Sequence, residues 1–193
     1  DFTIFGGIYR DVWLITTPKQ HFDLADFGSN GVYIDTKDVS ESGASYTIRG
    51  NVKNDESQAK KIEVAYTLKD PLGKIIKTDK NTITIQPNSK SSFSYTGKID
   101  NPQLWSPEHP NLYAVEISVY DPKTKQILDK VNNNTGFRWY KFDGKEGFFL
   151  NGKPYKLNGV CRHQDQQPIG NALSDEMHRR DMQMIKDMGV NFI

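Results

Sequence analysis

Apolar and polar residues alternate along two segments of this 193-residue chain, and this alternation constrains the fold more than any other feature. Residues 46–53 and 61–69 both show a period of two. The apolar residues that would share one face are Tyr46, Ile48 and Val52 in the first segment, and Ile62, Val64, Tyr66 and Leu68 in the second. Successive side chains of a β-strand point to opposite faces of its sheet, so each segment is predicted to be a strand with one buried face.

Shorter apolar segments extend this pattern over residues 21–140. Further strands are predicted around residues 83–85, 93–95, 113–119 and 127–131. Turns rich in Pro, Gly, Asn and Asp separate the strands, at residues 70–73, 86–88 and 121–123. About seven short strands within about 110 residues are typical of an immunoglobulin-like β-sandwich, which we predict for residues 21–140.

Residues 141–193 have a different pattern. Asn151-Gly152 is a signal for a two-residue turn, and apolar residues on both sides of it predict a small hairpin. A polar loop follows at residues 161–173. Ser174 is then expected to cap a helix that ends near Gly189.

Strand-like residues flank this helix, at 156–160 before it and at 190–193 after it. Strand, helix and strand in this order predict a βαβ unit, which needs a parallel sheet. The fold class expected for the chain is therefore mainly β: the sandwich, followed by the first βαβ unit of an incomplete (β/α)8 TIM barrel.

Composition excludes several functional classes. The 25 basic and 24 acidic residues leave a formal charge of +1, which argues against a nucleic-acid-binding protein. No apolar run approaches the roughly 18 residues of a membrane span. Cys161 is the only cysteine, so neither an internal disulfide nor a cysteine metal site is expected. We interpret Cys161 as a small, buried apolar side chain.

Four segments of the chain resemble, in the same order, the β-galactosidases of glycoside hydrolase family 2. Phe5-Gly6-Gly7-Ile8-Tyr9-Arg10-Asp11-Val12 resembles the last strand of the family's N-terminal jelly-roll sugar-binding domain, which we expect at residues 1–20. Leu104-Trp105-Ser106-Pro107 with Leu112-Tyr113 resembles a segment of its middle immunoglobulin-like domain, expected at residues 21–140.

The other two segments are similar to the family's catalytic barrel. Gly136-Phe137-Arg138 with Phe149-Leu150-Asn151-Gly152-Lys153-Pro154 resembles the entry into that barrel. Asn158-Gly159-Val160-Cys161-Arg162-His163-Gln164-Asp165, followed by Gly170-Asn171-Ala172-Leu173, resembles the first barrel strand and its loop. The resemblance therefore implies that residues 141–193 are the N-terminal part of a truncated catalytic domain.

The resemblance implies that the whole protein is a bacterial retaining glycosidase that hydrolyses terminal β-D-galactosides or related oligosaccharides in carbohydrate metabolism. Such enzymes use two carboxylates about 5–5.5 Å apart, one as acid and base and the other as nucleophile. In this family both are glutamates on later barrel strands, so we expect them beyond Ile193 and expect no catalytic residue, and no activity, in this chain alone. β-Glucuronidase and β-mannosidase remain alternatives within the family. A standalone immunoglobulin-like carbohydrate-binding or adhesion module remains an alternative outside it.

The resemblance also assigns the candidate substrate-binding residues. His163 is expected to contact the sugar in the catalytic subsite, Arg162 to support the site, and Asp165 to lie in the same loop, where TIM-barrel active sites form. Two departures from the family pattern are Cys161, where many members have Asn, and Gln164, where some have Glu. Arg162-His163 with the downstream Pro168 favours a galactosidase.

Other features of the family carry over only as expectations. Its members often use Mg²⁺ or Na⁺, but His21, His109 and His178 show no ligand spacing with His163, so no metal site is expected here. The resemblance is compatible with a homo-oligomer located in the cytoplasm or the periplasm.

Four aromatic residues, Trp105, Tyr113, Trp139 and Tyr140, suggest sugar-stacking platforms, but the first three are better interpreted as packing residues. Trp105 and Tyr113 are expected in the sandwich core, and Trp139 at the junction between sandwich and barrel.

Overall fold

The structure is a computed structural model that describes residues 6–193. It divides the chain into two compact units, which are described separately here. One unit, the sandwich unit, comprises residues 16–141 and 150–152. The other, the loop-helix unit, comprises the described residues up to Ile15 together with residues 142–149 and 153–193.

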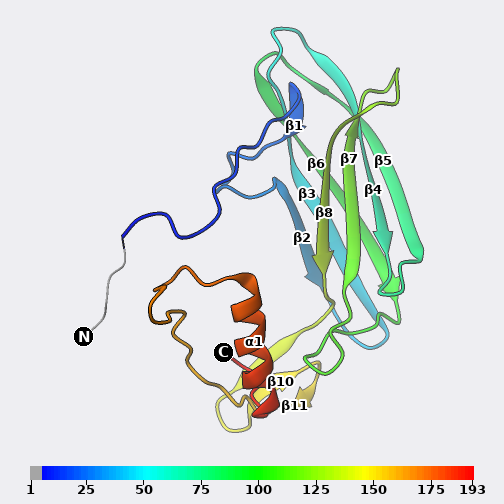
Figure 1. The fold of residues 1–193 in the computed structure, drawn as a ribbon. Coiled ribbons are helices and arrows are strands. Elements are labelled where there is room, and N and C mark those ends of the chain that lie inside the picture. Colours follow the sequence, from blue (N-terminus) through cyan, green and yellow to red (C-terminus); the bar gives the residue numbers. More distant parts are fainter. Residues whose placement is uncertain (1–5) are drawn as a thin grey trace. The chain divides into compact units, whose positions relative to one another are not determined.

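The sandwich unit is built from two antiparallel sheets (Figure 1). In the first sheet, β3 (Gly43–Asn54) pairs with β1 (Gln20–Phe22), β2 (Val32–Lys37) and β6 (Ser89–Asp100). The second sheet has the order β5 (Ile75–Ile85), β4 (Lys60–Lys69), β7 (Tyr113–Tyr120) and β8 (Ile127–Thr135). The predicted immunoglobulin-like sandwich is confirmed, and β1 and β2 are additions that the sequence pattern had not indicated.

The core lies between these two sheets and follows the period-two pattern of the sequence. Along β3 and β4 buried residues alternate with more exposed ones, and Ile48, Ile62 and Val64 are completely buried. Phe22 of β1 and Phe93 of β6 meet in this core with their ring centroids 5.9 Å apart. Burial of these side chains is the main source of stability for a domain of this kind.

Three buried tyrosines form a polar contact inside the core. The hydroxyls of Tyr46 and Tyr66 lie 3.0 Å apart, and the Tyr95 hydroxyl donates to the carbonyl of Val64 at 2.6 Å. Burial raises the pKa of Tyr66, and it raises the pKa of Tyr95 to about 12. The hydroxyls therefore stay protonated and their desolvation is offset by hydrogen bonds.

The two sandwich aromatics expected in the core behave differently. Tyr113 is buried and packs edge-on against Phe137, with the ring centroids 4.8 Å apart. The prediction for Trp105 was wrong. Its side chain is only partly buried and lies outside the core cluster, and the guanidinium of Arg138 covers its ring at 4.4 Å from the ring centroid.

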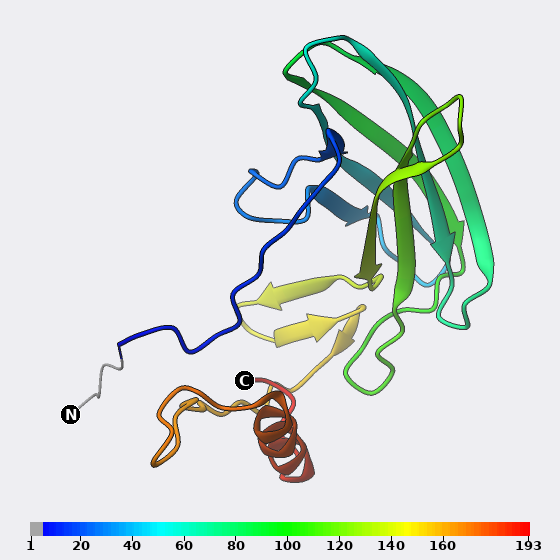
Figure 2. The ribbon, with the colours of Figure 1, turned by 45° about the horizontal axis from the view of Figure 1, so that its top comes forward.

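A third, small sheet has the order β11 (Lys153–Pro154), β10 (Gly147–Leu150) and β9 (Tyr140–Asp143) (Figure 2). Asn151 and Gly152 have φ angles of +50° and +80°, the conformation that a two-residue hairpin turn requires. The predicted hairpin is confirmed. Trp139 packs on this turn, since a Cβ added to Gly152 would lie 3.1 Å from its ring.

The loop-helix unit contains α1 (Asp175–Asp187), which begins and ends as predicted. The Ser174 hydroxyl accepts a hydrogen bond from the backbone N–H of Met177 at 3.3 Å, and Gly189 has a φ of +83°. The flanking strands are reduced to a single parallel bridge between Gly159 and Phe192. Strand, helix and parallel strand thus occur in the expected βαβ order.

One prediction for this unit needs correction, and one stays a prediction. Cys161 is exposed, not buried, and lies two residues after the bridged Gly159, where the polar loop begins. The strand-like N-terminal stretch forms no strand over residues 6–18, since no described segment pairs with it, and the rest of that stretch lies outside the described residues. Its apolar side chains are exposed, with Trp13 at 78% and Leu14 at 92%. No helix in residues 6–193 is long and apolar enough to cross a membrane.

Candidate functional site

The candidate site is the loop at residues 161–173, which precedes α1 in the loop-helix unit. Gln166 and Gly170 close a tight turn through two backbone hydrogen bonds, of 3.1 Å from the Gln166 N–H and 2.7 Å from the Gly170 N–H. Gly170 has a φ of +57°, and it is buried together with Leu173. The loop is therefore a folded segment with its own internal hydrogen bonds.

Arg162 is held by the helix. Its Nε donates to the Oδ2 of Asp181 at 2.9 Å, and its Nη2 donates to the same oxygen. The side chains of Arg162 and Asp181 are only 14% and 25% exposed. Partial burial reduces solvent screening, so this pair fixes the start of the loop to α1 more firmly than a surface ion pair would.

His163 and Asp165, the other two sequence-predicted residues, lie on the same loop with exposed side chains. The structure thus places all three candidate residues in a four-residue stretch that follows the strand position of Gly159. In a parallel β/α fold this is the end of the strand at which active sites form. That position permits a substrate contact for His163, and the contact itself remains a prediction.

Sequence reasoning missed one member of this site. Arg10 lies 154 residues before Gln164, yet its Nη2 donates to the Oε1 of Gln164 at 3.1 Å. Its Nη1 lies 3.4 Å from the Nε2 of His178, on α1. No local pattern could have indicated contacts over such a separation, although Arg10 belongs to the N-terminal motif on which the family resemblance rests.

A hollow of about 230 Å³ lies between the loop and the helix. It is lined by Gln166, Met177, Arg180, Asp181 and Met184. Two thioether side chains beside an ion-paired carboxylate make this hollow partly apolar. Asp181, the partner of Arg162, forms part of its wall.

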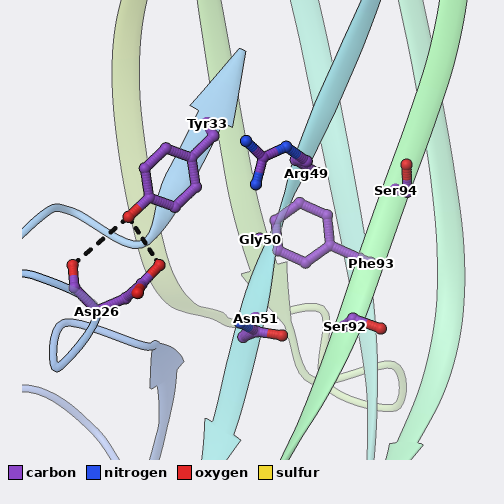
Figure 3. A pocket seen from close by; sticks show the side chains of 8 residues that line it. All are labelled: Asp26, Tyr33, Arg49, Gly50, Asn51, Ser92, Phe93 and Ser94. Carbon is purple, nitrogen blue, oxygen red and sulfur yellow. Dashed lines mark hydrogen bonds between the residues drawn. The ribbon is translucent and has the colours of Figure 1, made fainter. Parts of the chain in front are cut away.

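A larger hollow of about 310 Å³ lies on the sandwich, where polar side chains of β2, β3 and β6 surround it (Figure 3). Its charged groups already have partners. The guanidinium of Arg49 lies 4.9 Å from the ring centroid of Tyr33 and donates to Asp35 at 2.6 Å, which lowers the pKa of Asp35. Asp26 accepts from the Tyr33 hydroxyl at 2.7 Å. The charged side chains around this hollow are therefore paired with one another or with Tyr33.

In residues 6–193, no three His, Cys, Asp or Glu side chains lie close enough together to hold a metal ion. His21 instead has a structural position: it is buried, and its Nδ1 lies 2.7 Å from the carbonyl oxygen of Phe22 and its Nε2 lies 3.1 Å from Asp55.

Comparison with known proteins agrees with this architecture. Residues 30–138 match the sequence model of glycosyl hydrolases family 2, and residues 143–193 match that family's TIM barrel domain. A β-glucuronidase of Bacteroides fragilis is 36% identical over all of this chain, which covers 27% of that protein. A β-galactosidase of Bacteroides ovatus is 29% identical over 97% of the chain, which covers 21% of that protein.

The solved structures include a Bacteroides uniformis β-glucuronidase covalently bound to cyclophellitol-6-carboxylate aziridine. It is 53% identical with a TM-score of 0.97, over all of this chain and 23% of that one. The chain spans about a quarter of the length of the curated relatives that it matches. Because the family model covers more than half of the chain and the barrel model covers most of the remainder, the chain belongs to glycosyl hydrolases family 2.

Proposed function

We propose that the chain is the middle portion of a longer retaining glycosidase that hydrolyses terminal β-D-glucuronides. The observation that carries this proposal is the 53% identity, at a TM-score of 0.97, to a β-glucuronidase whose bound inhibitor carries a ring carboxylate. The sequence motifs alone favoured a β-galactosidase. The glucuronidase alternative has better support, because the β-galactosidase of Bacteroides ovatus is only 29% identical.

In this proposal the parts of the chain have separate tasks. Residues 1–20 complete a preceding sugar-binding domain, residues 21–140 hold that domain to the barrel, and residues 141–193 begin the barrel. The family matches at 30–138 and 143–193 support the second boundary. The exposed Trp13 and Leu14 support the boundary near residue 20, because apolar side chains this exposed are suited to packing against another domain.

The chemistry of a retaining glycosidase defines what the loop contributes. One carboxylic acid protonates the leaving oxygen, a carboxylate attacks the anomeric carbon, and water then releases the sugar from that carboxylate. We assign both groups to later barrel strands. His163 forms a hydrogen bond to a sugar hydroxyl that strengthens as the ring gains oxocarbenium character. Asp165 lies at the rim of the same subsite.

Arg162 supports the site without binding the substrate carboxylate. Both of its hydrogen bonds go to Asp181, so its charge is compensated within the chain. A uronate needs an uncompensated cation or several N–H donors to offset its desolvation. In this proposal those donors come from other parts of the barrel, and Arg162 fixes the loop beside them.

The test is the substrate preference of the full-length protein. We expect kcat/KM for 4-nitrophenyl β-D-glucuronide to exceed that for the β-D-galactoside and the β-D-mannoside by at least about tenfold, because only the uronate leaves buried donors paired. The 193-residue chain alone serves as the negative control. A tenfold preference for the galactoside would instead establish a β-galactosidase. No turnover of any of the three glycosides would contradict both the glucuronidase and the galactosidase assignment.

A further inference from the structure

Two side chains of the loop on either side of His163 are connected to the same helix, one directly and one through Arg10. Arg162 reaches α1 through Asp181. Gln164 accepts a hydrogen bond from Arg10, whose other amino group lies against His178 of α1. We propose that Arg10 is a positioning residue that holds the loop carrying His163 against α1. The proposal rests on the proposed function, because it assumes that His163 acts on substrate.

The helix geometry brings the two connections together. His178 and Asp181 are three residues apart, and residues at this spacing are neighbours on one helix face. The Arg162–Asp181 pair and the Arg10–His178 contact therefore attach to the same side of α1. Since His163 lies between Arg162 and Gln164, its backbone is restrained on both sides by contacts that converge on this face.

The chemistry of the contact requires an arginine. One amino group donates to the amide oxygen of Gln164 at 3.1 Å, while the other lies 3.4 Å from the Nε2 of His178. A guanidinium presents these donors in a rigid, planar fork. A lysine has a single ammonium at the end of a flexible chain, so it can replace one of the two contacts but not hold both in one geometry.

The contact of Arg10 connects the N-terminal segment to the loop that carries His163. Arg10 belongs to the N-terminal part of the loop-helix unit, far from the loop in sequence. Its guanidinium also lies 5.2 Å from the ring centroid of Tyr9, which orients it along its own segment. In the full-length enzyme, any movement of this segment would be transmitted to the loop beside His163.

The first test measures the loop without reference to catalysis. Hydrogen–deuterium exchange of the full-length protein is compared for wild type, Arg10→Met and Arg10→Lys, using peptides over residues 161–173 and, as an internal reference, over β3. Arg179→Met is the matched control, because Arg179 is an exposed arginine of α1 whose own pair with Asp175 is 3.7 Å long.

We expect Arg10→Met to raise exchange in the 161–173 peptide about 3- to 10-fold, the range for losing a net contribution of one or two exposed hydrogen bonds, with β3 unchanged. Arg10→Lys should restore part of the protection. Exchange in Arg10→Met that equals that of the Arg179→Met control would overturn the proposal. This result does not depend on which glycoside the enzyme hydrolyses. It therefore separates failure of the positioning role of Arg10 from failure of the proposed function.

The second test asks whether the restraint matters for the reaction. On the preferred glycoside, Arg10→Met should lower kcat about 3- to 10-fold with KM nearly unchanged, because a misplaced His163 weakens transition-state contacts more than substrate binding. Gln164→Ala should cause a similar loss, and the double variant should be little worse than either single one. Looser exchange with unchanged kcat would contradict the positioning role, and so would fully additive losses.

Discussion

Gly97 lies opposite Tyr46 in the pairing of β6 with β3, and replacing it with alanine should destabilise the sandwich. A Cβ at this position would lie 2.3 Å from the hydroxyl oxygen of Tyr46 and 2.4 Å from its Cζ. The Tyr46 ring is only 3% exposed and its hydroxyl is 3.0 Å from that of Tyr66, so the ring cannot turn away without losing this bond. Overpacking costs about 1–3 kcal/mol and the lost hydrogen bond about 1 kcal/mol. We therefore expect a loss of about 2–4 kcal/mol.

Urea unfolding followed by circular dichroism measures this loss directly as a lower midpoint with an unchanged slope. Gly43→Ala is the matched control, because its Cβ would meet only the carbonyl of Ile99, at 3.5 Å, an ordinary contact. The control should change the free energy of unfolding by less than about 0.5 kcal/mol. If Gly97→Ala were as stable as Gly43→Ala, the packing of Tyr46 over Gly97 described here would be wrong.

Three further predictions concern the sandwich unit and the segment that follows it. The hydrogen bond from Lys90, at 2.9 Å, lowers the pKa of Asp23 below its ordinary value even though burial raises it, so the stability from this carboxylate is present above about pH 4 and is lost as pH falls further. In Asp23→Asn the free energy of unfolding should therefore fall less steeply between about pH 5 and pH 2 than in wild type. The same pH dependence in both proteins over this range would contradict this prediction. A chain of residues 16–152 should unfold cooperatively alone, because the core cluster draws only on residues 22–137. Proteases should remove residues 153–193 first, since α1 has no buried residue; a protected helix would refute this.

The sequence predicted elements that depend on local physics. The period-two pattern placed Ile48 and Ile62 in the core, and a hydroxyl followed by two acids placed the start of α1. The pattern did not indicate β2, because its middle residues are all partly buried and no clear alternation results. The core position predicted for Trp105 was wrong, and its ring instead contacts Arg138, 33 positions later, which no local pattern indicates.

The candidate site was predictable only through the family resemblance. Nothing in the spacing of Arg162, His163 and Asp165 alone indicates a sugar subsite, and the partner of Arg162 on α1 required the structure. His178 matches no motif of the family and shows no ligand spacing with His163. In the structure its Nε2 lies 3.4 Å from Arg10. Contacts between distant segments depend on how the chain folds back, which local patterns do not encode.

The most direct test of the account is the effect of His163→Ala in the full-length enzyme. If this loop residue contacts the sugar in the catalytic subsite, kcat/KM on the preferred glycoside should fall by roughly 10²-fold or more, about 2.7 kcal/mol, mainly through kcat. His109→Ala is the control, because His109 is an exposed histidine in a turn of the sandwich unit, and it should change kcat/KM less than about twofold. Equally small effects from both substitutions would contradict the assignment of this loop to the active site.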